Sequence, residues 1–278
     1  MKQIKTLHLF PQLTNELLRL LKSLDSSDWL KPSPIKNRTV KDLVSHLIDG
    51  SLRRLSMQRD GFLDETNSPN ITSYNDLVGF IQMLNNDWIN VSRRLSPTIL
   101  IDFLKYSENK LLDFFKTLNP NDKALFSVAW AGESESDNWF DIAREYTEKW
   151  HHQMQIRLSL DKPILLDKEY SEPLYDTFML ALPHLYHDFT NYNNGAKIKI
   201  SLTGNLSKNW VIERQPDKWK FADSESTDIH TMVEIPDSIA WILFTNTDRN
   251  KEKYKTNIKI NGDKLIGLKL LDFITVMS

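Results

Sequence analysis

The sequence predicts an all-α four-helix bundle in the first half of the chain, followed by a smaller α+β domain with an antiparallel sheet. Apolar residues recur at helical spacing through the first half, this pattern ends near Asp161, Lys162 and Pro163, and short alternating segments follow. Of the 278 residues, 40% are hydrophobic and 26% charged, the balance of a globular protein with a sizeable core. We therefore expect residues 1–160 to form the helical domain and residues 161–278 to form the α+β domain.

Five amphipathic helices are expected in the first half, a leading helix and four longer ones joined by moderate loops. In each, apolar residues at helical spacing line one face that can enter a common core. Residues that favour helix N-caps stand where four of these helices begin. The candidate caps are Thr39 with Asp42, Ser73 with Asp76, Ser96 before Pro97, and Asn138. The helices are expected at about residues 13–24, 40–55, 77–95, 97–118 and 138–158.

The second half combines few helices with several short strands. Residues 197–202 alternate between polar and apolar side chains, as a half-buried strand does, and the turn-like sequence QPDK further on indicates a hairpin. A helix over about residues 174–185 should end or kink at Pro183. The remaining expected elements are hairpin strands with Trp210 and Ile212 and with Trp219 and Phe221, a strand at 256–260, and a closing helix at 265–274.

Composition excludes several classes of function. The 35 Lys and Arg residues against 37 Asp and Glu give a net charge of −2, which argues against a nucleic-acid-binding surface or a basic membrane patch. The first residues lack a signal-peptide pattern, and no apolar run is long enough to span a membrane, so a cytoplasmic protein is expected. None of the 8 glycines forms a phosphate-binding loop, and with Cys at 0 there is no thiolate ligand and no cysteine nucleophile.

A carboxylate and a histidine share one face of the last helix of the first half. Glu148 and His152 are four residues apart, so their side chains lie one turn apart and could bind one metal ion. A solvated surface pair has the same spacing, and this alternative stays open. His46, at the margin of an apolar stripe, could supply a third ligand, although a single histidine there is more often structural. A catalytic site needs three such ligands and a free fourth position.

The other histidines offer weaker patterns. His184 and His187 form a rival pair three residues apart, but Pro183 stands at its start and no third ligand is nearby in the sequence. Spacing suggests no partner for His8, His151 and His230.

Two segments carry a resemblance to a known superfamily. TVKDLVSHLIDG at residues 39–50 and NWFDIAREYTEKWHHQ at residues 138–153 resemble the superfamily of DinB-like proteins and mycothiol-dependent maleylpyruvate isomerases. The resemblance implies a helix bundle in which His46, Glu148 and His152 bind one divalent metal ion. The glutamate variant is more similar to the maleylpyruvate isomerase branch. In the second half LTGN, the tryptophan-bearing strands and GDKL resemble the sterol-carrier-like α+β domain of that branch.

The resulting hypothesis is a metal-dependent enzyme of the thiol-transferase or isomerase type that acts on a small-molecule substrate. Two histidines and a glutamate suit Zn²⁺ and also accept Ni²⁺ or Fe²⁺. Because the chain has no cysteine, the nucleophile would be a low-molecular-weight thiol or a water molecule on the metal.

Three further residues have roles in this hypothesis. Arg144 would orient the glutamate or bind a substrate carboxylate, Asp49 would accept a hydrogen bond from an imidazole, and Trp130 would line the pocket. The alternative is a non-catalytic protein that binds a metal in the bundle and a small apolar ligand in the second domain. A closed metal site would favour this alternative, and an open coordination position would favour the enzyme.

Overall fold

The structure, a computed structural model, describes residues 2–62 and 71–276 and divides into two compact units. The helical unit contains residues 5–62, 71–125 and 137–164. The sheet unit contains residues 2–4, 126–136 and 165–276. The main boundary therefore lies close to the one expected from the sequence, but two short stretches of the first half belong to the unit formed by the second half.

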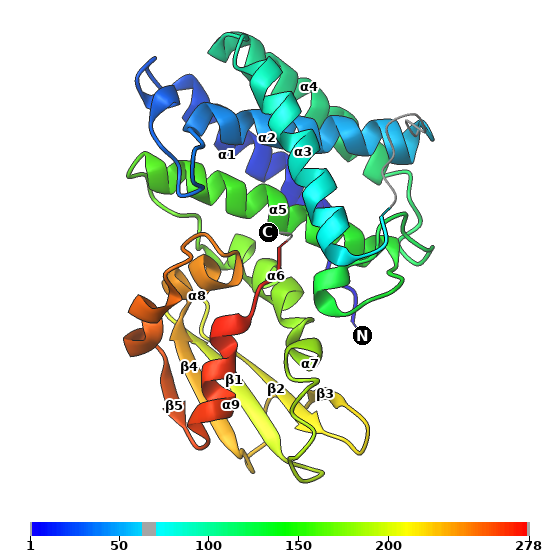
Figure 1. The fold of residues 1–278 in the computed structure, drawn as a ribbon, viewed down its shortest axis with the longest axis vertical. Coiled ribbons are helices and arrows are strands. Elements are labelled where there is room, and N and C mark those ends of the chain that lie inside the picture. The colour runs from blue at the N-terminus through cyan, green and yellow to red at the C-terminus, as the bar shows by residue number, and fades with distance from the viewer. Residues whose placement is uncertain (1, 63–70, 277–278) are drawn as a thin grey trace. The chain divides into compact units, whose positions relative to one another are not determined.

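The helical unit contains the helices predicted from apolar periodicity (Figure 1). They are α1 Phe10–Lys22, α2 Val40–Arg54, α3 Tyr74–Ser92, α4 Pro97–Phe115 and α5 Asn138–Ser159, with short turns at Leu7–Leu9, Asp28–Leu30 and Leu55–Arg59. α2 packs against α3, α4 and α5, and α1 packs against α4 and α5. The helical fold of the first half is thus confirmed, whereas a strict arrangement of four helices stays an expectation.

Side-chain caps begin three of these helices as the sequence predicts: Ser96 Oγ accepts from Ile99 N (3.3 Å) at the start of α4, and reciprocal capping boxes begin α2 and α3. Thr39 N donates to Asp42 Oδ2 (3.0 Å), and Asp42 N donates back to Thr39 Oγ1 (3.3 Å). Ser73 and Asp76 form the same reciprocal pair before α3. Each box satisfies backbone N–H groups that have no partner inside the helix.

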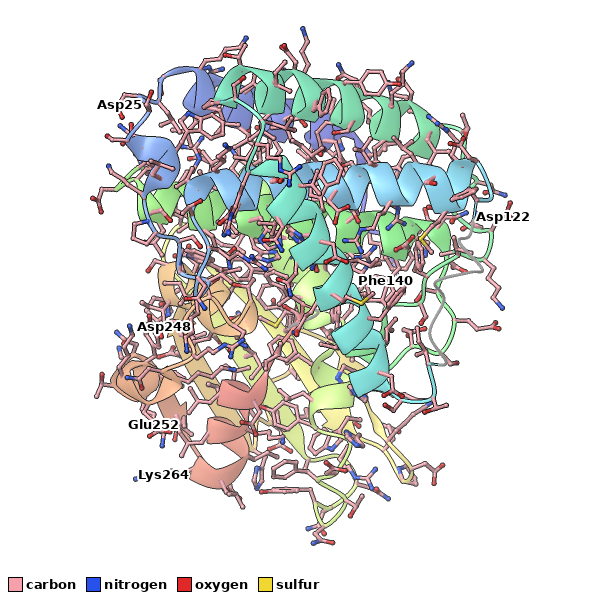
Figure 2. The ribbon with its side chains drawn as sticks, turned by 45° about the horizontal axis from the view of Figure 1, so that its top comes forward. Asp25, Asp122, Phe140, Asp248, Glu252 and Lys264 are labelled. Atoms are coloured by element: carbon pink, nitrogen blue, oxygen red, sulfur yellow. The ribbon has the colours of Figure 1, made fainter. Side chains whose placement is uncertain are left out.

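The interior of the helical unit is built from the apolar faces of α1, α2, α4 and α5. Fully buried members include Leu21, Val44, Leu104 and Ile156. Side chains fill the space between the helices, and Asp25 and Asp122 mark loops at opposite ends of the unit (Figure 2). None of the helices in residues 2–62 and 71–276 is both long and apolar enough to cross a membrane.

The sheet unit contains a five-stranded sheet in the order β3-β2-β1-β4-β5, with helices packed on one face (Figure 1). Its strands are β1 Lys197–Thr203, β2 Lys208–Arg214, β3 Trp219–Ala222, β4 Thr231–Pro236 and β5 Lys259–Asn261. Its helices are α6 Lys168–Met179, α7 Leu182–Leu185, α8 Asp237–Phe244 and α9 Lys264–Leu268, with short turns at Ala129–Ala131, Lys251–Asn257 and Lys269–Asp272. The predicted hairpin is confirmed, because β2 and β3 pair antiparallel.

The prediction of a purely antiparallel sheet is wrong. β1 pairs parallel with β4, so the sheet is mixed. Residues 223–230 return the chain to the start of β4 on the far side of β1, which a local hairpin signal cannot reveal. β4 alternates buried and half-buried residues along its length and was not among the expected strands.

Other boundaries in this unit also differ from the expected ones. The helix expected at 174–185 is two helices, and Pro183 lies in the first turn of α7, where its missing N–H costs little. The strand expected at 256–260 is β5, and the closing helix is the short α9 followed by a 3₁₀ turn.

Candidate metal site

α5 buries polar side chains along most of its length. It begins at Asn138 with Asp137 at the N-cap position, one residue before the expected cap. From Asp141 to Arg157 only Arg144 and Glu148 are not fully buried. The alternative of a solvated surface pair on this helix face is therefore wrong, and each buried charge needs a partner.

A first group of buried charges is neutralised within the helical unit. Arg54 of α2 pairs with Asp141 and, through Nη1, with Glu145 Oε2 (3.2 Å). Arg144 Nη2 lies 3.0 Å from Asp141 Oδ1 and 3.3 Å from Glu145 Oε2. Burial alone would raise the pKa of Glu145, but attraction to Arg54, Lys149 and Arg144 outweighs it and lowers this pKa to about 2. Glu145 is thus ionised and fully paired.

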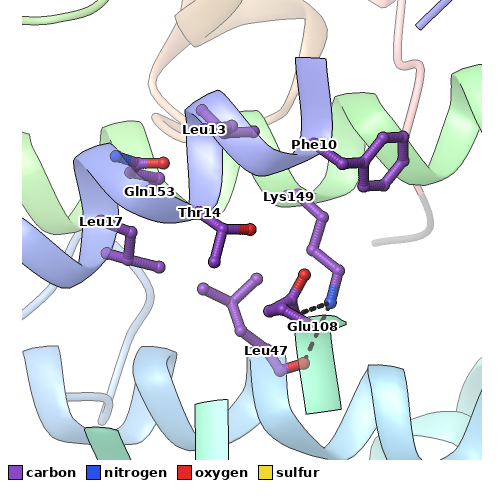
Figure 3. Close-up of a pocket in the computed structure, with 8 residues that line it drawn as sticks. All are labelled: Phe10, Leu13, Thr14, Leu17, Leu47, Glu108, Lys149 and Gln153. Carbon is purple, nitrogen blue, oxygen red and sulfur yellow. Dashed lines mark hydrogen bonds and ion pairs between the residues drawn. The ribbon is translucent and has the colours of Figure 1, made fainter. Parts of the chain in front are cut away.

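A second group surrounds the Lys149 ammonium (Figure 3). Lys149 Nζ donates to Glu108 Oε1 (2.7 Å) and to Leu47 O (3.1 Å). It also donates to Ser51 Oγ. The cavity beside it is about 10 Å³, close to the space of one water molecule, so it is no substrate pocket. The six charges of the two groups, three of each sign, compensate one another: Arg54, Arg144, Lys149, Asp141, Glu145 and Glu108.

Glu148 differs from these acids because its neighbours are histidines. Among the described residues, its ion-pair partners are His151, with Nδ1 at 3.9 Å from Oε2, and His152, with Nε2 at 3.7 Å. Burial raises the pKa of Glu148 to about 7, with repulsion from Glu145 added and attraction to Arg144 opposing it. A cation held between Glu148 and the imidazoles would supply the missing charge.

Both neighbouring histidines have the protonation state that metal binding requires. His152 Nδ1 donates to Gln155 Oε1 (2.9 Å), so Nε2, which lies toward Glu148, carries the lone pair. His151 Nδ1 donates to Thr147 O (3.0 Å). Burial lowers the pKa of His151 to about 3 and that of His152 well below its usual range, so both imidazoles are neutral at pH 7.

Four side chains meet at this point of the helical unit. Ligand atoms of Glu148, His151 and His152 all lie within 4.8 Å of one another. His46 of α2 lies beside them, with its ring centroid 4.6 Å from that of His152. The structure thus brings together the three residues predicted from the sequence and adds His151. The signal that could have revealed His151 is its position three residues after Glu148, on the same side of α5.

The residues expected to support the site make other contacts. Asp49 pairs with Arg53 (3.0 Å) and not with an imidazole; the acceptor for His152 is Gln155. Arg144 is bound to Asp141 and Glu145, so it does not contact Glu148 through a described ion pair.

Trp130 belongs to the sheet unit and is largely buried there, at 9% exposure. A role for Trp130 in the pocket stays a prediction.

The rival pair of histidines also belongs to the sheet unit. The rings of His184 and His187 stack with centroids 4.9 Å apart, and His187 is 58% exposed. In the described residues this pair is joined by no third histidine or carboxylate at the spacing of the α5 group. Instead His184 packs on Gly132, where a Cβ atom would lie 2.5 Å from Nδ1.

The α5 group fits a divalent transition metal. Two ligands bound at about 2.1 Å in tetrahedral geometry lie about 3.4 Å apart, close to the 3.7 Å between Glu148 Oε2 and His152 Nε2. Neutral imidazoles and one carboxylate are ligands that Zn²⁺ accepts, and Ni²⁺ and Fe²⁺ accept them as well.

The chain thus combines two units. The helical unit holds a largely buried cluster of histidines and one carboxylate, which is a candidate metal site, and the other unit contains a mixed sheet. The chain belongs to the family of the mycothiol maleylpyruvate isomerase N-terminal domain, whose model matches residues 10–157. The chain is also similar to two crystal structures, the mycothiol-dependent maleylpyruvate isomerase and a variant of it with one histidine changed to alanine.

Each of these structures shares 12% identity and a TM-score of 0.53, over 92% of this chain and 91% of the other. This similarity extends through both units and concerns the fold. The comparison with curated proteins finds no match.

Proposed function

We propose that this chain is a metal-dependent enzyme of the thiol-transferase or isomerase type. It would use a low-molecular-weight thiol and act on a small-molecule substrate. The observation that carries the proposal is Glu148, a half-buried carboxylate without an Arg or Lys ion pair among the described residues, beside neutral histidines. The family and the structural relatives, which are described as mycothiol-dependent maleylpyruvate isomerases, supply the reaction class. The metal would be Zn²⁺, with Ni²⁺ or Fe²⁺ as alternatives.

In this proposal His46, Glu148 and His152 hold the metal. When bound, the metal would lower the pKa of a thiol or polarise a substrate carbonyl. Gln155 holds His152 in the tautomer whose Nε2 lone pair is free for the metal. Arg54 and Arg144 are paired with Glu145, so these two cations do not take the place of the metal beside Glu148. Since the chain contains no Cys, the thiol comes from outside.

The alternative of an apolar-ligand-binding protein has weaker support. The sheet unit has a hollow of about 490 Å³, which is large enough for a small molecule. Six of its eight lining residues have polar or charged side chains, which an apolar ligand could not hydrogen-bond. The lining residues are Lys199, Glu225, Ser226, Thr227, Ile229, His230, Met232 and Asn261.

The proposal is tested by metal content and thiol-dependent turnover of the full chain. The wild type should purify with about one metal ion per chain, because the cluster offers one set of ligands. His152→Ala and Glu148→Gln should lose that ion, whereas His187→Gln, a matched change at an exposed histidine, should keep it. Isomerisation of maleylpyruvate would be followed with mycothiol and with a panel of other small thiols.

Two results would contradict the proposal. One is a wild type that binds no divalent metal, and the other is turnover that is the same in wild type and His152→Ala. A thermal melt with and without chelator separates a catalytic from a structural ion, since a structural ion contributes its binding energy to folding.

A cytoplasmic location and a small-molecule partner, without nucleic acid or membrane, belong to the same proposal. The near-neutral net charge of −2 supports the absence of a nucleic-acid partner.

A further inference from the structure

We infer that His151 is a fourth protein ligand, which closes the coordination position that the other three ligands would leave open. This inference rests on the proposed metal centre and deepens it. The resting ion would then be held by His46, Glu148, His151 and His152. An external thiol could reach the ion only after His151 moves away.

The first support is the spacing of the cluster. His151 belongs to a group of potential metal ligands in the described residues, together with Glu148 and His152, whose ligand atoms lie within 4.8 Å of one another. Its ring centroid is 4.0 Å from that of His152, closer than the 4.6 Å between His46 and His152. A metal ion that binds Glu148 and His152 therefore lies within reach of the His151 side chain.

The second support is the hydrogen bonding of the imidazole. His151 is 3% exposed, and its Nδ1 proton is used by Thr147 O at 3.0 Å. Nε2 then carries the lone pair and accepts no hydrogen bond from the described residues. This lone pair can bind a metal ion. The bond to Thr147 O also fixes the ring, as bonds to the second nitrogen do for metal-bound histidines.

The third support is the charge that surrounds the ring. The nearby cations Arg54, Arg144 and Lys149 are already paired with Asp141, Glu145 and Glu108. A four-ligand set with one carboxylate carries a charge of −1 and suits a divalent ion in a closed, four-coordinate site.

The test compares wild type and His151→Gln in the full chain loaded with Co²⁺, whose visible spectrum reports its ligands. His151→Gln should weaken Co²⁺ and Zn²⁺ binding by more than about a hundredfold, beyond the roughly 10–100-fold that loss of a supporting group costs. The d–d bands should shift. Azide, a small anion that needs an open position, should change the spectrum of His151→Gln at concentrations that leave the wild type unchanged.

Two controls separate ligation from folding. His187→Gln replaces an exposed histidine and should leave metal affinity and spectrum as in the wild type. Thermal melts of metal-free His151→Gln and wild type report any loss of packing, which by itself would not create an azide site.

Each outcome decides a different point. Equal metal affinity and equal azide response in wild type and His151→Gln would overturn the role of His151 and leave the proposed enzyme intact. A wild type that binds neither Co²⁺ nor Zn²⁺ would overturn the proposed metal centre and this inference with it.

Discussion

The buried pair of Lys149 and Glu108 allows a quantitative test of how the helical unit is stabilised. Lys149 Nζ donates to Glu108 Oε1 (2.7 Å), and both side chains are 7% exposed. Lys149→Met keeps the length of the side chain but leaves the Glu108 carboxylate buried without its cation. Breaking such a pair costs about 3–5 kcal/mol. At roughly 2–4 °C per kcal/mol, Tm should fall by about 6–20 °C.

The assay is thermal and urea unfolding followed by far-UV circular dichroism, with chelator in every sample so that metal binding contributes nothing. Lys149→Met with Glu108→Gln should recover a large part of the loss, because the orphaned charge is then removed. Lys105→Met, at an exposed position of α4, is the matched control and should change stability by less than about 0.5 kcal/mol. A loss below about 1 kcal/mol in Lys149→Met, or a double variant less stable than the single one, would refute the reasoning.

Three further predictions concern single positions. The pKa of Glu145 is about 2, against an ordinary value of 4.5 for a glutamate in the unfolded chain. Its contribution of about 3 kcal/mol to stability is therefore present above pH 4.5 and is lost as pH falls toward 2. Urea midpoints from pH 6 to pH 2 should show this loss, and Glu145→Gln should not. Thr39→Ala removes the cap of α2 and should cost about 1 kcal/mol in urea unfolding, and no change would contradict the cap. Gly132→Ala should lower Tm more than Gly195→Ala, because both have positive φ but only Gly132 would place a Cβ 2.5 Å from His184. Equal Tm values would contradict that contact.

The helices of the first half were predictable because the signals for a helix are local. Apolar spacing and a cap such as Thr39 with Asp42 act within a few residues, so the sequence contains the whole interaction. The β2–β3 hairpin is local in the same sense. The parallel pairing of β1 with β4 is not, since the strands are joined through a hairpin and a long return segment. No local sequence pattern in either strand indicates which strand it pairs with.

The sequence by itself determined the helices, the shared face of Glu148 and His152, and the absence of any cysteine ligand. Only the tertiary structure decided that this face is buried, that His46 of α2 lies beside His152, and that Gln155 rather than Asp49 accepts from His152. The physical reason is that burial depends on which helices pack together. The same holds for the charges. Arg54 of α2 and Glu108 of α4 pair with charged residues of α5, and among the described residues the ion-pair partners left to Glu148 are histidines. These pairs join residues far apart in the chain, so the sequence alone could not reveal them.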